Sequence, residues 1–384
     1  MSKFYKYFLI LLPTVVILQP LLPFLLAQVF LIFKLILIPV IILYYLGTPK
    51  NIIWFYFIIL HLVGLLAIYQ PSNLYQYFIN FLCIFSSIPL FILGKHLVKS
   101  NYNLSNFKYL VYGTNIFNII TLGLLLLVTI GYVDISQVYE PLGRGDDVWL
   151  GSWRFSLGNA IETPFIATIF LFAGILLTKR ENKSAVFVAS TLLNFTVSLI
   201  SQSRVVIAIS LLLFLYQLTK VSMIKKIMIV SLITSIVLSA GVFINEIGLS
   251  LLDRLSGNDY GSTDQRLRFV NIISENLFEN NFLIGNGLTS SYDLNLEKFG
   301  RYQTGESVLL ELIYDTGILG AFLIFIPVLK NNLKSLLKGE YRLALLFVYI
   351  QVMFLLPLFS SMMFVFFIFG INSWGPKKIN AIGM

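Results

Sequence analysis

The sequence predicts an all-α integral membrane protein, a bundle of about twelve transmembrane helices with both termini in the cytoplasm. Three observations predict it: the composition, the length of the apolar runs and the sidedness of the basic residues. Apolar residues make up 58% of the 384-residue chain and charged residues only 12%, whereas soluble domains carry roughly 25% charged residues. We therefore expect the whole chain, 1–384, to form a single polytopic membrane domain.

The expected spans follow from the apolar runs, because a helix needs about 20 mostly apolar residues to cross a bilayer. Residues 7–46 form one nearly continuous run that contains Pro20 and Lys34. A single span of that length is too long, so a hairpin around 20–27 is expected to divide it. The expected spans are about 7–24, 27–46, 52–69, 74–93, 109–131, 163–178, 185–201, 205–219, 224–246, 306–329, 343–357 and 359–374.

The basic residues assign an orientation, because cytoplasmic loops are enriched in Lys and Arg. With the N-terminus in the cytoplasm, 18 of the 27 basic residues fall on the cytoplasmic side, and 16 of these are Lys. Eight fall on the outer side, and seven of those are Arg. The net charge of +9 is therefore explained by the cytoplasmic lysines and indicates no nucleic-acid partner.

The outer arginines are the first candidate binding residues. Arg binds phosphate or carboxylate through two parallel hydrogen bonds, whereas Lys is the usual charge that sets topology. Most acidic residues also fall on the outer side, so each of these arginines either pairs with an acid or binds an anionic ligand. Arg204, in a very short outer connection, either reaches the lipid headgroups or anchors an anionic lipid substrate, and we favour the second. The candidates are Arg154, Arg204, Arg266, Arg268 and Arg301.

Two outer connections are long, about 132–162 and 247–305, and long outer loops indicate a site at the outer membrane face. Transporters more often have compact loops and two corresponding halves with broken helices, and the sequence has no internal repeat. Asp146 and Asp147 in the first loop are more often a solvated pair than a cation site, so no metal or other cofactor is expected. His61, like the other histidine, is placed away from the outer face, which argues against histidine catalysis.

In the second outer loop, a Ser-x-x-Gln capping box at 262–265 predicts an amphipathic helix over 262–280. At 100° per residue, Arg266 falls in line with the apolar residues Val270, Ile273 and Leu277. Arg268 lies nearly opposite, where a solvated face explains it. A charge on a packing face needs a partner or a ligand, so we favour Arg266 over Arg268 as a site residue. The helix leads into FLIGNG, 282–287, whose glycines predict a chain reversal.

Three carboxylates belong to the expected span 306–329. Glu306, in its first turn, is favoured there by the helix dipole or acts as a general base at the outer leaflet. Glu311 and Asp315 share a face at i, i+4, where like charges repel. One of them is then protonated, or paired with Arg or Lys34, or both belong to a structural network. We expect chemistry at Glu306 and a structural role for the other two.

The order of these features resembles the O-antigen polymerase and ligase superfamily, in particular the Wzy-type polymerases of surface polysaccharide synthesis. The matching stretches are RFSLGN before a span, SR opening a span, a long outer loop with an early Arg, a GxG turn, and ESxLLELxxxxGxLG over 306–320. The resemblance covers roughly residues 150–325. It implies a membrane-embedded glycosyltransferase with a GT-C-like helical bundle in the inner membrane, facing the periplasm.

The resemblance also implies substrate and roles. The substrate is an oligosaccharide repeat unit on undecaprenyl pyrophosphate, joined into O-antigen or capsule-type polysaccharide, and no cofactor takes part. Arg154, Arg204 and Arg266 match the family's outer-face arginines and are expected at the pyrophosphate. The ligase branch usually has a His just before the late span, where this chain reads TGES, so Glu306 becomes the candidate base. Expected partners are membrane lipids, a Wzz-type chain-length co-polymerase and a flippase.

Three alternatives stay open at this stage. A sister O-antigen ligase would transfer finished glycan to lipid A core, and the missing His argues against it. A lipid-linked oligosaccharide flippase or another transporter would line a path through the bundle with charges, whereas these arginines gather at one membrane face. A non-catalytic scaffold would not need arginines on the packing face of an outer helix.

Overall fold

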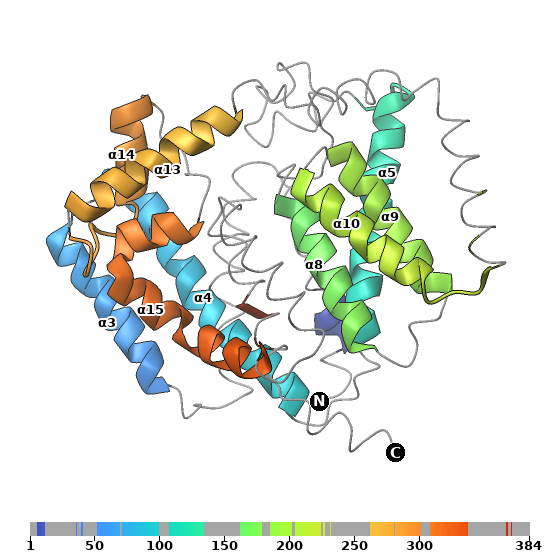
Figure 1. Cartoon of the computed structure of the whole chain (residues 1–384), viewed down its shortest axis with the longest axis horizontal. Helices are drawn as coiled ribbons and strands as arrows, with labels where there is room; N and C mark the ends of the chain where they lie inside the picture. Colours follow the sequence, from blue (N-terminus) through green and yellow to red (C-terminus); the bar gives the residue numbers. More distant parts are fainter. Residues whose placement is uncertain are drawn as a thin grey trace. The chain divides into compact units, whose positions relative to one another are not determined.

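The computed structural model describes the following part of the chain: residues 6–11, 36, 40, 52–69, 71–99, 107–133, 162–178, 185–201, 204–223, 226, 231, 262–279, 281–300, 308–336, 366, 367 and 370. Every regular element in these ranges is a helix and none is a strand, which confirms the all-α fold class for them (Figure 1). The expected spans 7–24, 27–46, 224–246, 343–357 and 359–374, and the outer loop 132–162, fall almost wholly outside the described residues.

Seven expected spans coincide with helices of the structure, within the one or two residues by which helix ends usually vary at most boundaries. Three described helices contain a segment long and apolar enough to cross a membrane: Leu74–Leu97, Lys108–Val128 and Leu309–Ile326. The described part of the chain is therefore helical and contains three candidate membrane spans. The seven helices are α3 (Ile52–Ile68), α4 (Leu74–Lys99), α5 (Lys108–Thr129), α8 (Glu162–Leu177), α9 (Ala185–Ser201), α10 (Arg204–Leu218) and α15 (Val308–Leu336).

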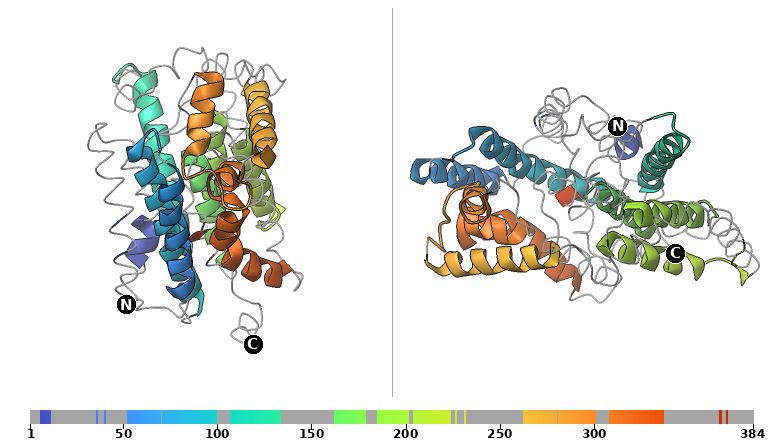
Figure 2. Two further views of the ribbon diagram at one scale, coloured as in Figure 1. Left: turned by 90° about the vertical axis from the view of Figure 1, so that its left-hand side faces the viewer. Right: turned by 90° about the horizontal axis from the view of Figure 1, so that it is seen from above.

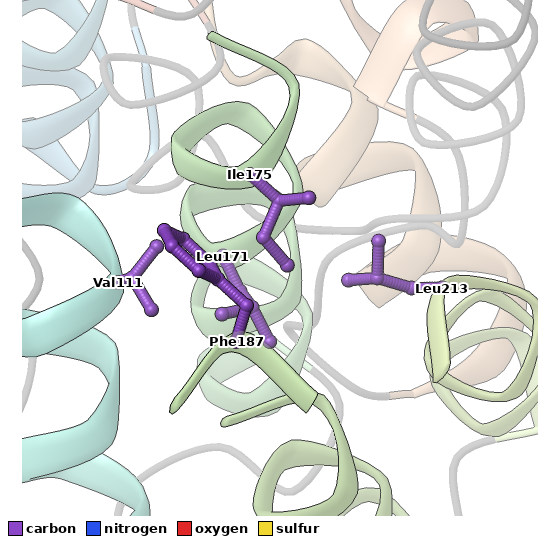
Figure 3. Packing of buried hydrophobic residues seen from close by; sticks show 5 residues of the cluster. All are labelled: Val111, Leu171, Ile175, Phe187 and Leu213. Carbon is purple, nitrogen blue, oxygen red and sulfur yellow. The ribbon is translucent and has the colours of Figure 1, made fainter. Parts of the chain in front are cut away.

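The chain divides into two compact units, of which the first comprises Met1–Phe30 and Tyr102–Tyr260. Helices α5, α8, α9 and α10 pack together in this unit around a buried apolar cluster (Figure 3). Each of the four helices contributes to it, so the cluster joins all four. Its members are Val111, Leu171, Ile175, Phe187 and Leu213.

A buried network of neutral polar side chains crosses the same unit. The amide nitrogen of Asn194 in α9 donates to Thr168 Oγ1 of α8 at 2.9 Å and to Ser210 Oγ of α10 at 3.0 Å. Asn118 of α5 donates to Asn194 Oδ1 at 3.3 Å. Polar side chains buried among apolar helices need partners, and these four residues supply them to one another. The network therefore fixes which faces of the four helices meet.

Replacement of Asn194 by alanine is expected to lower the free energy of unfolding by roughly 1–2 kcal/mol, since hydrogen bonds between membrane helices are individually modest but three are lost together. Reversible unfolding in detergent would measure the loss. Thr196→Val is the matched control, because within the described residues the Thr196 hydroxyl bonds to Leu192 of its own helix and to no other helix. Equal losses in the two variants would contradict a role for the network between helices.

The second unit comprises Leu31–Asn101 and Gly261–Met384 and includes α3, α4 and α15. Two further helices belong to it, α13 (Ser262–Glu279) and α14 (Ser290–Phe299). The first confirms the predicted amphipathic helix. The second was not predicted, because the sequence analysis placed only a chain reversal and a loop between residues 282 and 305.

Helices α13 and α14 lie side by side against α15 (Figures 1 and 2). Their contact is a buried apolar cluster to which each of the three helices contributes. The α13 residues recur every four positions, as one face of a helix requires. Helices α13 and α14 are thus held on α15, the helix that bears Glu311 and Asp315. The cluster comprises Phe269, Ile273, Leu277, Leu294 and Tyr314.

Candidate functional site

Helix α15 is broken at Gly317, where the backbone adopts φ 70° and ψ 173°. The sequence analysis expected a span over about 306–329 and did not anticipate a break within it. The two halves of α15 run in different directions from the break (Figure 1). A break in a membrane helix removes backbone hydrogen bonds, and the freed groups must find partners within the protein. The residues that bond to these freed backbone groups make up the candidate site.

The turn at 282–287, between α13 and α14, supplies those partners. Two α15 carbonyls that face the break accept hydrogen bonds from turn amides, and two α15 amides beyond it donate to turn carbonyls. The turn therefore supplies partners for four backbone groups around the break, from residues 28 to 36 positions earlier in the chain. The four bonds are Asn286 N–H to Tyr314 O at 3.1 Å, Gly287 N–H to Asp315 O at 2.9 Å, Ile318 N–H to Phe282 O at 3.0 Å and Leu319 N–H to Leu283 O at 3.1 Å.

Two glycines permit this close approach. A Cβ atom at Gly285 would lie 2.4 Å from the backbone nitrogen of Gly317, and a Cβ at Gly317 would lie 2.4 Å from the backbone of Ile284. Both residues also have a positive φ, which L side chains rarely adopt. The glycines of the turn and Gly317 of α15 therefore form one close backbone contact. The sequence analysis interpreted them as two separate motifs.

His61 of α3 binds the same break. Its Nε2 lies 2.9 Å from the carbonyl oxygen of Thr316, the residue before Gly317. A nitrogen that contacts a carbonyl oxygen donates, so Nε2 carries the proton in this arrangement. Gly320 leaves room for the imidazole, since a Cβ there would lie 2.6 Å from Nε2. The sequence analysis placed His61 apart from the candidate site, whereas the structure brings it to the residue next to Asp315.

Asp315 is fully buried and caps the N-terminus of α14. Its carboxylate accepts the backbone N–H groups of Thr289 and Ser291, each at 2.8 Å, and the Ser290 hydroxyl at 3.0 Å. The first amides of a helix have no partner within the helix, and a carboxylate there also meets the positive end of the helix dipole. Asp315 therefore caps α14, a helix that was not predicted from the sequence.

Glu311 lies one turn before Asp315 and is also fully buried. Its charge acts on Tyr292 of α14: burial raises the pKa of the Tyr292 phenol well above its usual value, and Glu311 and then Asp315 raise it further. A hydrogen bond with the Asn80 side chain of α4 opposes the shift. The neutral phenol is favoured, so Tyr292 can serve as a hydrogen-bond donor within this buried polar cluster.

Asp293, in the first turn of α14, binds residues at the end of α3 and in the connection that follows it. The Tyr69 hydroxyl and the Ser72 hydroxyl both donate to its carboxylate. Burial raises the pKa of Asp293, and a hydrogen bond from the backbone of Ser72 opposes this shift. Gly287 also lies against the Tyr69 ring, where a Cβ would be 2.4 Å away. The connection between α3 and α4 is therefore tied to the start of α14.

The structure places only some of the arginines and carboxylates expected from the sequence. Arg154, Arg301 and Glu306 lie outside the described residues. Arg204 begins α10 in the first unit, as expected from the short connection before it. The others belong to the second unit, where α13 and α15 pack together; they are Arg266, Arg268, Glu311 and Asp315.

The register of α13 supports the distinction drawn between its two arginines. The buried residues of the helix are Phe269, Ile273 and Leu277, and position 266 lies on their side because residues three and seven apart share a helix face. Arg268 is exposed, as expected for a solvated face. Within the described ranges, no three His, Cys, Asp or Glu side chains gather as a metal site requires.

Comparisons with known protein families, with curated proteins and with solved structures find no match to this chain.

Proposed function

We propose that this protein is a membrane-embedded glycosyltransferase, a Wzy-type polymerase that joins lipid-linked oligosaccharide repeat units at the outer face of the inner membrane. One observation carries the proposal: the arginine-bearing helix α13 packs its apolar face on α15, the membrane helix with two buried carboxylates. This is the juxtaposition that an anionic lipid substrate at a membrane face would need. The resemblance over residues 150–325 supplies the reaction class.

In the proposed reaction, a hydroxyl of the incoming repeat unit attacks the anomeric carbon of the growing chain. The bond from that carbon to the pyrophosphate oxygen breaks, and undecaprenyl pyrophosphate leaves with the electron pair. Glu306 takes the hydroxyl proton as general base. Arg154, Arg204 and Arg266, assisted by Arg268 and Arg301, stabilise the charge that builds up on the leaving pyrophosphate.

In this proposal the buried carboxylates Glu311 and Asp315 hold the site in place and do not react with the substrate. Asp315 holds α14 and the turn at 282–287 in place, and Glu311 lies between it and the start of α15. Both residues are fully buried, so they support the site and are not offered to a substrate. A preorganised binding surface depends on such supporting groups because small displacements reduce catalysis strongly.

A transporter remains the alternative of another class, and the broken helix α15 favours it, because broken helices line the sites of many transporters. In those sites the freed backbone groups bind the ion or the substrate. Here four such groups bond to residues 282–287 and the Thr316 carbonyl bonds to His61. These backbone groups therefore already have partners within the protein and are not free to bind a transported ion or substrate. We therefore keep the polymerase as the proposed function. An O-antigen ligase is the remaining alternative.

Complementation of a strain that lacks the protein tests the proposal, read as the ladder of surface glycan at equal expression. We expect the wild-type chain to restore the ladder. Arg266→Ala and Glu306→Gln should leave a single repeat unit on the lipid, and exposed Arg268→Ala should shorten the ladder without abolishing it. Lys298→Ala is the control, because Lys298 is exposed and pairs only with neighbouring Glu297 at the surface, at 3.1 Å.

The alternatives give different results. A ligase would change only whether finished long glycan reaches its acceptor. A flippase would leave unpolymerised repeat units on the cytoplasmic side when it is absent. A full ladder in Arg266→Ala would contradict the assignment of Arg266 to the pyrophosphate.

A further inference from the structure

We infer that the turn at 282–287, within the predicted outer loop 247–305, is a re-entrant membrane segment whose side chains contact the hydrocarbon of the bilayer. The inference does not depend on the proposed activity. It rests on the depth of the turn, the exposure of its apolar side chains and the bonding of its backbone.

The depth follows from helix α15. The turn bonds to α15 on both sides of Gly317, through residues 314, 315, 318 and 319. Gly285 lies against the backbone of Gly317 itself. Residue 317 is near the middle of Leu309–Ile326, the segment of α15 that is long and apolar enough to cross a membrane. The turn therefore lies beside the middle of this candidate span.

At that depth the turn exposes large apolar side chains. Leu283 is 65% exposed and Ile284 is 48% exposed. The backbone of the turn is bonded to Ile318 and Leu319 of α15, which are themselves 40% and 50% exposed. Together these side chains make one exposed apolar surface, continuous with a helix that is long and apolar enough to cross a membrane. In water such a surface would be unfavourable, whereas hydrocarbon matches it.

The backbone of the turn meets the condition that hydrocarbon imposes. Non-helical backbone is tolerated at membrane depth only where its polar groups are bonded within the protein. The carbonyl of Asn281 accepts from the amides of Ile284 and Gly285, at 3.1 and 2.6 Å. The carbonyls of residues 282 and 283 and the amides of residues 286 and 287 are all bonded to α15. The amides of residues 284–287 and the carbonyls of residues 282 and 283 thus have partners within the protein, as a turn beside hydrocarbon requires.

The exposed residues at the end of α14 are charged and are expected to lie in water, outside the hydrocarbon. The helix begins at the buried residues Ser290 and Ser291 and ends in the charged pair Glu297 and Lys298, whose side chains are 69% and 44% exposed. It therefore leads the chain from the apolar depth back to water. The inference thus places Leu283 in lipid and Lys298, 15 residues later, in water.

Site-directed spin labelling tests this placement in proteoliposomes of neutral and anionic phospholipids. The background is the full chain with its one cysteine, the buried Cys83, replaced by serine. Nitroxides are attached at Leu283→Cys, Ile284→Cys and, as matched control, Lys298→Cys. Collision rates are measured with oxygen, which concentrates in hydrocarbon, and with a water-soluble nickel chelate. Leu319→Cys on α15 gives the reference for lipid contact.

We expect labels at 283 and 284 to collide mainly with oxygen, as at 319, and the label at 298 to collide mainly with the nickel chelate. Nickel collision at 283 and 284 equal to that at 298 would place the turn in water and overturn the inference. Protection from both reagents would mean that protein covers the turn, which overturns it as well. Two independent turn positions, each checked for a monodisperse elution profile, keep the test decisive if one variant fails to fold.

Discussion

Replacement of Gly317 by alanine is expected to unfold the second unit or to lower its stability by at least about 2 kcal/mol. The positive φ alone costs an L residue about 1–2 kcal/mol. The new Cβ would also lie 2.4 Å from the backbone of residues 283 and 284, which cannot move without breaking their bonds to α15. The loss should appear as a lower Tm in detergent and as less folded protein at equal expression.

Gly64→Ala is the matched control for this change, because it lies in α3 of the same unit with no atom within 4 Å of the added Cβ and no positive φ. Its Tm should equal that of the wild type. A Gly317→Ala protein as stable as Gly64→Ala would show that the break at 317 is not a fixed feature of the fold. It would also remove the basis for treating the turn and α15 as one element.

Replacement of Asp315 by alanine is the second large effect we expect. It removes the acceptor for two buried amides, and each buried donor left without a partner costs about 1–3 kcal/mol. We therefore expect a loss of about 3 kcal/mol in the free energy of unfolding. Asp315→Asn keeps one carbonyl acceptor and should fall between alanine and the wild type. The measurement is unfolding in detergent followed by the fluorescence of tryptophan.

The control for Asp315 is Glu297→Ala, a carboxylate of α14 that is 69% exposed and paired only at the surface. Exposed pairs contribute about 0–1 kcal/mol, so its loss should be small. Equal losses at 297 and 315 would contradict the capping role. If Asp315→Ala keeps its fold but its glycan ladder is lost, the positioning of α14 matters to activity beyond stability.

The helices were predictable where local pattern decides them. The apolar run expected at 185–201 is α9, Ala185–Ser201, and the capping box at 262 opens α13, Ser262–Glu279. In both cases a window of one helix length contains all the information, because composition sets the membrane span and side-chain periodicity sets the amphipathic face. The buried face of α13 also followed from the register of its apolar residues.

The break in α15 was not predictable in the same way. Isolated glycines are common in membrane helices, so nothing near Gly317 marks it as a break. What stabilises the break is a turn 30 residues earlier, through bonds that only the folded chain forms. Helix α14 escaped prediction for a related reason. Its sequence SSYDLNLEKF is largely polar, and its N-terminus is capped by Asp315 from another helix.

Of the candidate site, the sequence identified the acid pair and the two faces of α13. It missed His61, Tyr292 and Asp293, whose partners are distant in the chain. The signal that could have linked them was the pairing of two glycine motifs, GNG at 285–287 and TGILG at 316–320. Each was interpreted alone as a turn or a helix pattern. Because both need a positive φ or a close backbone approach, considering them together would have suggested one contact.

The bonds between the break at Gly317 and residues 282–287 also constrain the order in which the chain can fold. The turn at 282–287 leaves the ribosome before α15, so its amides and carbonyls are without their final partners until residue 319 has been made. Until then the turn cannot enter hydrocarbon, since its unpaired backbone would have to shed water at a cost of several kcal/mol per group. On the inference that the turn is re-entrant, its insertion waits until α15 has been synthesised as far as residue 319 and then occurs together with that helix.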